Sequence, residues 1–201
     1  MNSKIIRSII LASTSPRRSE LLSCLGLSFT VVPSHADEQV DESLTPEQVV
    51  SELSARKAIS VYESLDSANQ NAVIIGSDTI VVRDHIILGK PHDKVEAASM
   101  LSSLQGRSHQ VWTGVTCIDG LTGEQSTCHR VTTVTMKSLT EEEIGAYAHS
   151  GEGLDKAGAY GIQGLGASIV TGIEGCYFNV VGLPLSLLSD MLKKYDIQVL
   201  H

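Results

Sequence analysis

The chain has 201 residues, with 23 acidic and 15 basic side chains and a formal net charge of −8. Hydrophobic residues at 42% and charged residues at 19% exclude a disordered chain and fit one domain, residues 1–201, with a full core. The acidic balance disfavours non-specific binding to nucleic acid or an anionic membrane. The absence of an apolar run of about 18 residues excludes a membrane-spanning helix. With no signal-peptide pattern and four scattered cysteines typical of reduced thiols, we expect a cytoplasmic protein.

The chain begins with alternating strands and helices. Residues 5–12 are apolar and rich in Ile, which predicts a buried strand. Ser15, followed by proline, predicts a helix start, and Gly26 predicts its end. Residues 29–33 predict a second strand, and the polar residues 35–43 an acidic loop. These elements are the start of an α/β pattern.

The middle of the chain continues this alternation. Thr45 and Gln48 form a capping-box pattern for a long helix that runs to about residue 65. Two separate β-rich runs are expected at 72–75 and 79–82, and a turn leads into a third at 86–88. A capped helix follows from Asp93 to Gly106.

The last part combines a hairpin with a glycine-rich segment. Residues 109–118 and 127–136 predict two long strands that pair antiparallel, and a helix capped by Thr140 follows. Ten of the 17 glycines lie between residues 145 and 182, which predicts turns and close backbone approaches. A helix at 184–194 and a closing strand at 197–200 complete the pattern. The sequence therefore predicts an α/β fold with a mixed sheet.

The strongest candidate site lies where the first strand runs into a helix. The segment Ser13-Thr14-Ser15-Pro16-Arg17-Arg18 combines a helix N-terminus, which favours anions, with hydroxyl and guanidinium donors. Two arginines in a first helical turn oppose the helix dipole, a cost that an anionic ligand would offset. The alternative is a Ser-Pro cap with two solvated arginines. The pattern favours phosphate binding, but it is not a P-loop.

A second candidate is Asp78 in Gly76-Ser77-Asp78-Thr79. A carboxylate at a strand break between β-branched runs can bind a divalent cation or accept a proton from water. The alternative is a turn-forming aspartate, because Gly-Ser-Asp is also typical of turns.

Other charged residues are ambiguous by themselves. The adjacent Asp37 and Glu38 lie in the acidic loop and are most simply explained as solvated surface. Lys57 is expected within a helix, where an exposed lysine is the usual case. Lys90 lies between glycine and proline, which constrain its backbone and direct its side chain.

The glycine-rich segment 154–164 contains Lys156 and Gln163. Its glycines would let a planar ligand approach the backbone, and the Gln163 amide offers both a donor and an acceptor. A plain glycine-rich connector is an equally good explanation. Together the candidates suggest a nucleotide phosphohydrolase. They offer cationic groups for phosphates, carboxylates for a metal and an amide for a base.

These motifs occur in the order seen in the Maf family, which the chain resembles over essentially its whole length. The matching segments are residues 13–18, Asp37-Glu38, residues 55–58, residues 76–79, Gly89-Lys90-Pro91, residues 155–161 and residues 181–184. The resemblance implies an α/β fold like that of inosine triphosphatase, a mixed twisted sheet flanked by helices with a deep cleft between two lobes. It also implies a cytoplasmic homodimer that cleaves a nucleoside triphosphate to the monophosphate and pyrophosphate with Mg²⁺ or Mn²⁺.

Three positions track substrate specificity within the family. In this sequence the corresponding residues are Arg17, Thr79 and Gln163. This combination resembles the subgroup that acts on dTTP and UTP. The subgroup that acts on 7-methyl-GTP instead carries Trp, Gln and Glu at these positions.

The resemblance also implies roles for individual residues. Glu38 and Asp78 would hold the metal, and Asp78 would activate the attacking water, so Asp78, Glu38, Lys57 and Lys90 are the expected catalytic residues. Substrate binding is expected from a larger set: Ser13, Ser15, Arg17, Arg18, Lys156, Thr79 and Gln163. Two alternatives remain open. One is a house-cleaning pyrophosphatase for modified pyrimidine nucleotides, and the other is a nucleotide-sensing regulator of septum formation with little catalysis.

Overall fold

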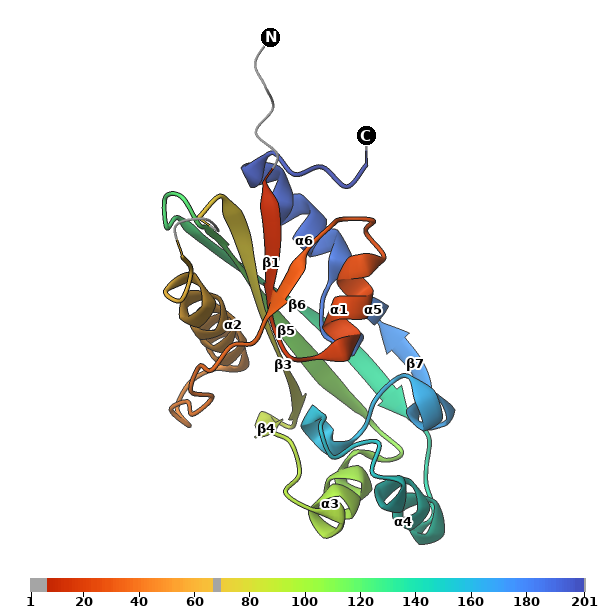
Figure 1. Cartoon of the computed structure of the whole chain (residues 1–201). Coiled ribbons are helices and arrows are strands. Elements are labelled where there is room, and N and C mark those ends of the chain that lie inside the picture. The colour runs from red at the N-terminus through yellow and green to blue at the C-terminus, as the bar shows by residue number, and fades with distance from the viewer. Residues whose placement is uncertain (1–6, 67–69, 201) are drawn as a thin grey trace. The chain divides into compact units, whose positions relative to one another are not determined.

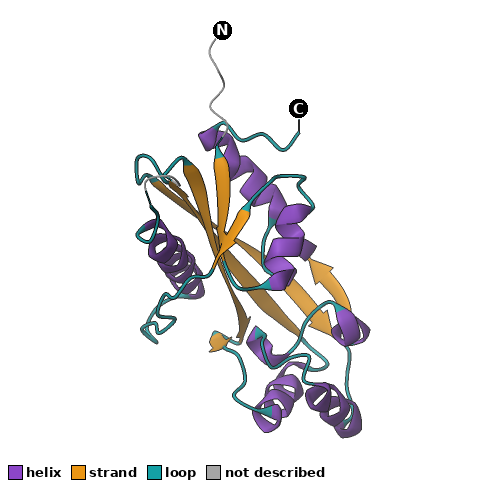
Figure 2. Cartoon of the chain, in the orientation of Figure 1, coloured by secondary structure: helices purple, strands orange, loops and turns teal. Residues whose placement is uncertain are grey.

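The computed structural model describes residues 7–66 and 70–200 of the chain, in which helices and strands are interspersed (Figures 1 and 2). The strands are β1 (Ser8–Ala12), β2 (Thr30–Val32), β3 (Ala72–Arg83), β4 (Ile86–Leu88), β5 (Ser108–Asp119), β6 (Gln125–Met136) and β7 (Val170–Glu174). The helices are α1 (Pro16–Ser23), α2 (Pro46–Tyr62), α3 (Lys94–Leu104), α4 (Glu141–Ser150), α5 (Tyr177–Val181) and α6 (Leu185–Leu192). Three short 3₁₀ helices are η1 (Ala157–Ala159), η2 (Gly164–Ser168) and η3 (Lys193–Tyr195).

The strands in the described residues form one mixed sheet in the order β2-β1-β3-β5-β6-β7, with β4 paired to β3. β1 runs parallel to β2 and to β3, whereas β4 and β7 run antiparallel to β3 and β6. The hydroxyl pairs Thr116–Thr127 and Ser108–Thr135, each 2.9 Å apart, run in opposite directions along β5 and β6. The predicted mixed sheet flanked by helices and the predicted antiparallel pair are therefore confirmed, while the cleft stays a prediction.

Local sequence signals position several helices as expected. The Thr45 side chain accepts a hydrogen bond from the Gln48 amide, and the Gln48 side chain accepts one from the Thr45 amide. Thr140 and Glu143 form the same capping box at α4. At α1, Ser15 occupies the N-cap position before Pro16 but makes no side-chain capping bond. The capping boxes therefore located the starts of α2 and α4 correctly, and the Ser15-Pro16 pair located the start of α1.

Two predicted strand features are wrong. The runs 72–75 and 79–82 are one unbroken strand, β3, so Asp78 lies within a strand and at no break or turn. Gly76 permits close packing, because a Cβ there would lie 2.3 Å from the Ser54 carbonyl oxygen on α2. The strand predicted at 197–200 is absent, and Leu200 there is exposed. The predicted first strand began at residues 5 and 6, which lie outside the described residues.

The chain divides into two compact units. The first contains the described residues among 1–78, 114–129 and 182–201, and the second contains residues 79–113 and 130–181. The prediction of a single domain stays a prediction. No helix in the described part of the chain is both long and apolar enough to cross a membrane.

In the first unit, helices lie on both sides of β1, with α2 on one side and α1 and α6 on the other (Figure 1). Ala58 and Val61 of α2 pack on Ile10, Ile74 and Ile118 of the strands. Burial of these apolar side chains is the main force that holds α2 against the strands.

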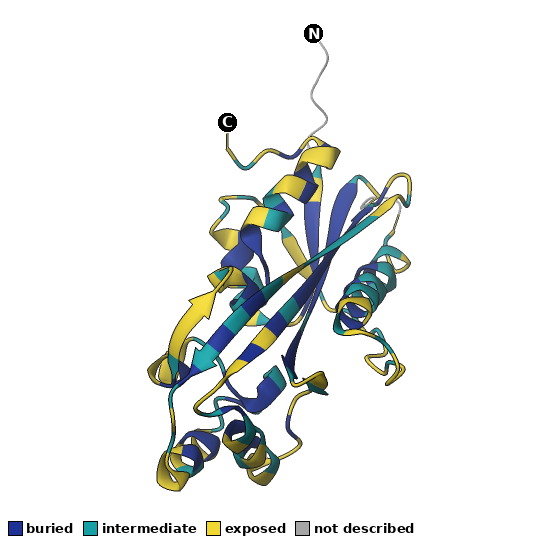
Figure 3. Cartoon of the chain, turned by 180° about the vertical axis from the view of Figure 1, so that it is seen from behind, coloured by how far each residue is buried: buried dark blue, intermediate teal, exposed yellow. Residues whose placement is uncertain are grey.

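The second unit has its own core. Leu101 and Leu104 of α3 pack with Ile144 and Tyr147 of α4 and with Val134 of β6. By contrast, β7 is exposed along most of its length (Figure 3). The core of this unit therefore lies between α3, α4 and β6, and β7 reaches it only at its first residue, Val170.

Candidate functional site

Lys57 joins the two carboxylates that the sequence singled out. Its Nζ lies 2.5 Å from Oδ1 of Asp78 and 2.8 Å from Oε1 of Glu38. Lys57 comes from the middle of α2, Asp78 from β3 and Glu38 from the loop that precedes α2. Three segments of the first unit therefore place one cation and two anions in direct contact.

The site is partly sheltered from water. Asp78 is 7% exposed, whereas the Glu38 side chain is 52% exposed. Charges in a partly buried site are screened less by solvent than surface charges are. The pair Lys57–Asp78 is therefore the buried centre, and Glu38 contacts it from the solvent side.

Arg18 of α1 belongs to the same group. Its Nε donates to the Gly182 carbonyl oxygen over 2.8 Å. Burial lowers the pKa of the Arg18 guanidinium, while the negative charges of Asp78 and Glu38 raise it and the neighbouring Arg17 lowers it. An arginine keeps its charge in proteins, so the site carries a fixed cation beside its carboxylates.

The serines before α1 have distinct roles. The Ser13 hydroxyl is buried and accepts a hydrogen bond from the Ser15 amide over 3.1 Å. Ser13 thus shapes the turn into α1, and Ser15 occupies its N-cap without a side-chain bond to the helix. Both serines lie at the helix end that attracts anions.

Ser77 is a member of this region that sequence reasoning missed. Its buried hydroxyl lies 3.0 Å from the carbonyl oxygens of both Gly114 and Gly182. The Gly182 oxygen therefore accepts from Ser77 and from Arg18, which links β3 to α1. No sequence pattern indicates this role, because the contact joins residues about 100 positions apart.

The other four predicted residues belong to the second unit. Thr79 follows Asp78 in β3, so its side chain points to the opposite face of the strand. The Thr79 hydroxyl lies 2.9 Å from the Thr113 hydroxyl. The Thr113 hydroxyl in turn donates a hydrogen bond to the Asn179 carbonyl oxygen. Lys90 is exposed and follows Gly89, whose carbonyl oxygen accepts from the Gly158 amide.

Lys156 and Gln163 lie in the glycine-rich segment. The Lys156 ammonium bonds the Asp155 carboxylate over 2.7 Å and also donates to the Glu152 carbonyl oxygen. Gln163 precedes η2 as its N-cap residue, and its side chain is exposed. The structure therefore places Gln163 at the start of η2 as an exposed residue.

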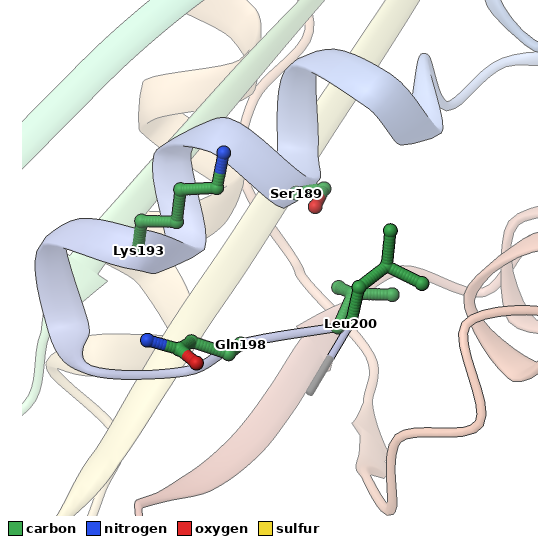
Figure 4. A pocket seen from close by; sticks show the side chains of 5 residues that line it. Ser189, Lys193, Gln198 and Leu200 are labelled. Atoms are coloured by element: carbon green, nitrogen blue, oxygen red, sulfur yellow. The ribbon is translucent and has the colours of Figure 1, made fainter.

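A separate pocket of about 280 Å³ lies beside α6 (Figure 4). It is lined by Ser189, Lys193, Gln198, Val199 and Leu200. None of the predicted site residues lines it, and none of its described lining residues carries a carboxylate. The pocket is therefore unrelated to the chemistry that the sequence predicts.

Comparison with known proteins supports a family assignment. The sequence model of the family Maf, described as "Maf-like protein", matches residues 8–195. A "dTTP/UTP pyrophosphatase" of Desulforamulus reducens is 46% identical over 96% of this chain and 100% of its own length. A protein of the same name from Pelotomaculum thermopropionicum is 47% identical over 97% of this chain and 100% of its own length. Another, from Thermoanaerobacter pseudethanolicus, is 50% identical over 96% of this chain and 99% of its own length.

A solved structure is also similar, but only distantly. "The structure of the Staphylococcus aureus Ham1 protein" matches 82% of this chain and 80% of its own, at 14% identity and a TM-score of 0.39. That score is too low to establish a shared fold.

Proposed function

Because the chain belongs to the Maf family, we propose that it is a nucleoside triphosphate pyrophosphatase that hydrolyses dTTP and UTP. Water adds across the bond between the α- and β-phosphates, and the products are the nucleoside monophosphate and pyrophosphate. The names of its relatives support this substrate choice. The observation that carries the chemistry is the contact of Lys57 with both Glu38 and Asp78.

The two carboxylates fit a hard divalent cation. Both place an oxygen within 3 Å of the same lysine nitrogen, so the two carboxylates lie next to each other. The described residues contain no group of three or more metal-ligating side chains. This suits Mg²⁺, which proteins hold through one or two carboxylates while phosphates and water complete its shell. We propose that Glu38 and Asp78 hold Mg²⁺ or Mn²⁺, which would neutralise phosphate charge and lower the pKa of bound water.

Asp78 is the proposed proton acceptor. Its carboxylate is largely shielded from bulk water, and Lys57 holds one of its oxygens. The second oxygen can accept the proton that leaves the attacking water. Lys57 offsets the negative charge of the pair, which would otherwise repel an incoming triphosphate.

The cationic groups of the first unit are proposed to bind the phosphates. Arg17 and Arg18 provide fork-shaped donors at the start of α1, and Ser13 and Ser15 lie just before them. Cleavage of a phosphoanhydride depends mostly on positioning and on stabilising developing negative charge, so such donors supply much of the rate.

The other predicted residues are proposed to bind the nucleotide as well. Lys90 and Lys156 would bind phosphate oxygens. Gln163, with Thr79, would select the base, since an amide matches the alternating acceptors and donor on the imide edge of thymine and uracil. We also propose that the protein acts in the cytoplasm as a homodimer.

The test is pyrophosphate release from a panel of nucleoside triphosphates with Mg²⁺ or Mn²⁺. We expect dTTP and UTP to be cleaved fastest, and Asp78→Asn to lower kcat about a thousandfold. Asp190→Asn, an exposed aspartate on α6, is the matched control and should keep full activity. Turnover of dTTP by Asp78→Asn at the wild-type rate would refute the assignment. Preference for modified pyrimidine triphosphates would favour the house-cleaning alternative.

A further inference from the structure

Glu152 makes an unusual set of contacts in the second unit. Its Oε2 accepts a hydrogen bond from the Leu165 amide, and its Oε1 accepts one from the Gly166 amide, each over 2.9 Å. The same Oε1 accepts from the Tyr147 hydroxyl over 2.8 Å. One carboxylate therefore binds two successive backbone amides at the start of η2 and a side chain of α4.

These hydrogen bonds hold the carboxylate in its charged form. Partial burial by itself would raise the pKa of Glu152, but the donors from Leu165, Gly166 and Tyr147 outweigh it, and the pKa is lowered. Hydrogen bonds to a charged acceptor are about twice as strong as neutral ones. Glu152 is thus a strong and permanent anchor at neutral pH.

Tyr147 extends the anchor to the other end of the segment. Its hydroxyl oxygen accepts a hydrogen bond from the Gly161 amide over 3.2 Å. The backbone is therefore fixed at Gly161 on one side of Gln163 and at Leu165 on the other, and both connections lead to Glu152.

Gly164 shows how closely the segment follows the carboxylate. Its φ of +61° is a conformation that favours glycine, and a Cβ there would lie 2.5 Å from Oε2 of Glu152. Gln163 itself makes no side-chain capping bond, and its side chain is exposed. The backbone on either side of Gln163 is therefore held by Glu152 and Tyr147, while the residue itself stays exposed.

We propose that Glu152, together with Tyr147, is a positioning residue that fixes Gln163 so that its amide reads the base of the nucleotide. This inference rests on the proposed function, because it assigns base recognition to Gln163. Base recognition requires the Gln163 amide to reach the same position in every complex, and a backbone held at Gly161 and Leu165 limits the positions that this side chain can reach.

The test compares Glu152→Gln with wild type. Glutamine keeps the size of the side chain, but its amide nitrogen cannot accept a hydrogen bond from Leu165 or Gly166. Glu142→Gln, an exposed glutamate in the first turn of α4, is the matched control. Kinetics with dTTP and dCTP measure specificity, and calorimetry with dTMP and dCMP measures base recognition without hydrolysis.

We expect Glu152→Gln to raise KM for dTTP about tenfold while kcat changes less than about threefold, and to lower the preference for dTTP over dCTP about tenfold. Tyr147→Phe should shift both quantities in the same direction by less, and Glu142→Gln should match wild type. A purely structural role would lower the thermal stability and reduce activity on both nucleotides equally. An unchanged preference for dTTP over dCTP in Glu152→Gln would overturn the inference. If Glu152→Gln does not fold, the same measurement on Tyr147→Phe decides.

The failure of this inference differs from the failure of the proposed function. If the wild-type protein does not cleave dTTP, the proposed function is wrong. Calorimetry still decides the inference, because loss of dTMP preference in Glu152→Gln would support it. Equal binding of dTMP and dCMP by the wild-type protein would refute it.

Discussion

The ammonium of Lys57 lies 2.5 Å from the Asp78 carboxylate, and the same ammonium contacts Glu38 at 2.8 Å. Lys57→Met removes the positive charge that contacts both of these anions. The carboxylates would then repel each other and the triphosphate, so we expect kcat for dTTP to fall at least about a hundredfold. Lys57→Arg should retain part of the activity, because it keeps the charge but not the compact geometry.

Steady-state kinetics with dTTP measure this effect. Lys193→Met, an exposed lysine after α6, serves as the control for loss of one positive charge. Activity of Lys57→Met within twofold of wild type would contradict a central role for this contact.

Arg56 holds the backbone on both sides of Glu38. Its Nη1 donates to the carbonyl oxygens of Asp37 and Gln39, over 3.2 and 2.5 Å, and Glu52 pairs with its Nη2. We expect Arg56→Met to release the loop and to raise the Mg²⁺ concentration for half-maximal activity about tenfold, since residues behind a metal ligand typically change affinity by that factor or more. Metal titrations test this, with exposed Arg130→Met as control. An unchanged Mg²⁺ requirement would mean that Glu38 is positioned without Arg56.

Gly76 is required by packing. An alanine Cβ there would lie 2.3 Å from the Ser54 carbonyl oxygen and 2.8 Å from the Ala58 amide nitrogen, both backbone atoms. We expect Gly76→Ala to lower the free energy of unfolding by about 3 kcal/mol. Gly145→Ala in α4, where no heavy atom lies within 4 Å, should raise it by about 1 kcal/mol. Urea denaturation of both variants measures the contrast, and equal effects would be inconsistent with the close packing of β3 on α2.

His109 predicts an acid-sensitive core. Its Nε2 lies 2.6 Å from the Tyr160 hydroxyl, and burial lowers the pKa of its imidazole from 6.5 to about 4. The unfolded chain binds this proton near pH 6.5 and the folded chain only near pH 4, so stability is lost as pH falls through this range. Between pH 7 and pH 4.5 the loss is about 2 kcal/mol.

The variant His109→Phe removes the titrating group. We expect its free energy of unfolding, measured in urea, to fall less between pH 7 and pH 4.5 than that of the wild-type protein. The same pH dependence in both proteins would assign the acid sensitivity to other groups.

The predictions that succeeded from sequence depend on local chemistry. Thr45 with Gln48 and Thr140 with Glu143 form their capping boxes within one helical turn, so neighbouring residues contain all the required information. The turn after Arg83 was equally readable, and Asp84 and His85 there adopt positive φ. The prediction of a break at Asp78 failed because Gly-Ser-Asp is typical of turns. Here the glycine is needed instead because the backbone of Ser54 and Ala58 on α2 leaves no room for a Cβ.

The sequence by itself determined the helix starts, the alternation of strands and helices, and a set of candidate residues whose order matches one family. The resemblance to that family, rather than the residues alone, also predicted that Glu38, Lys57 and Asp78 are catalytic. Only the tertiary structure decided that Lys57 contacts both carboxylates, that Arg56 holds the loop of Glu38 and that Glu152 holds the segment of Gln163. Caps and turns are set by residues a few positions apart, whereas a site depends on side chains from distant segments, which meet only when the core has packed.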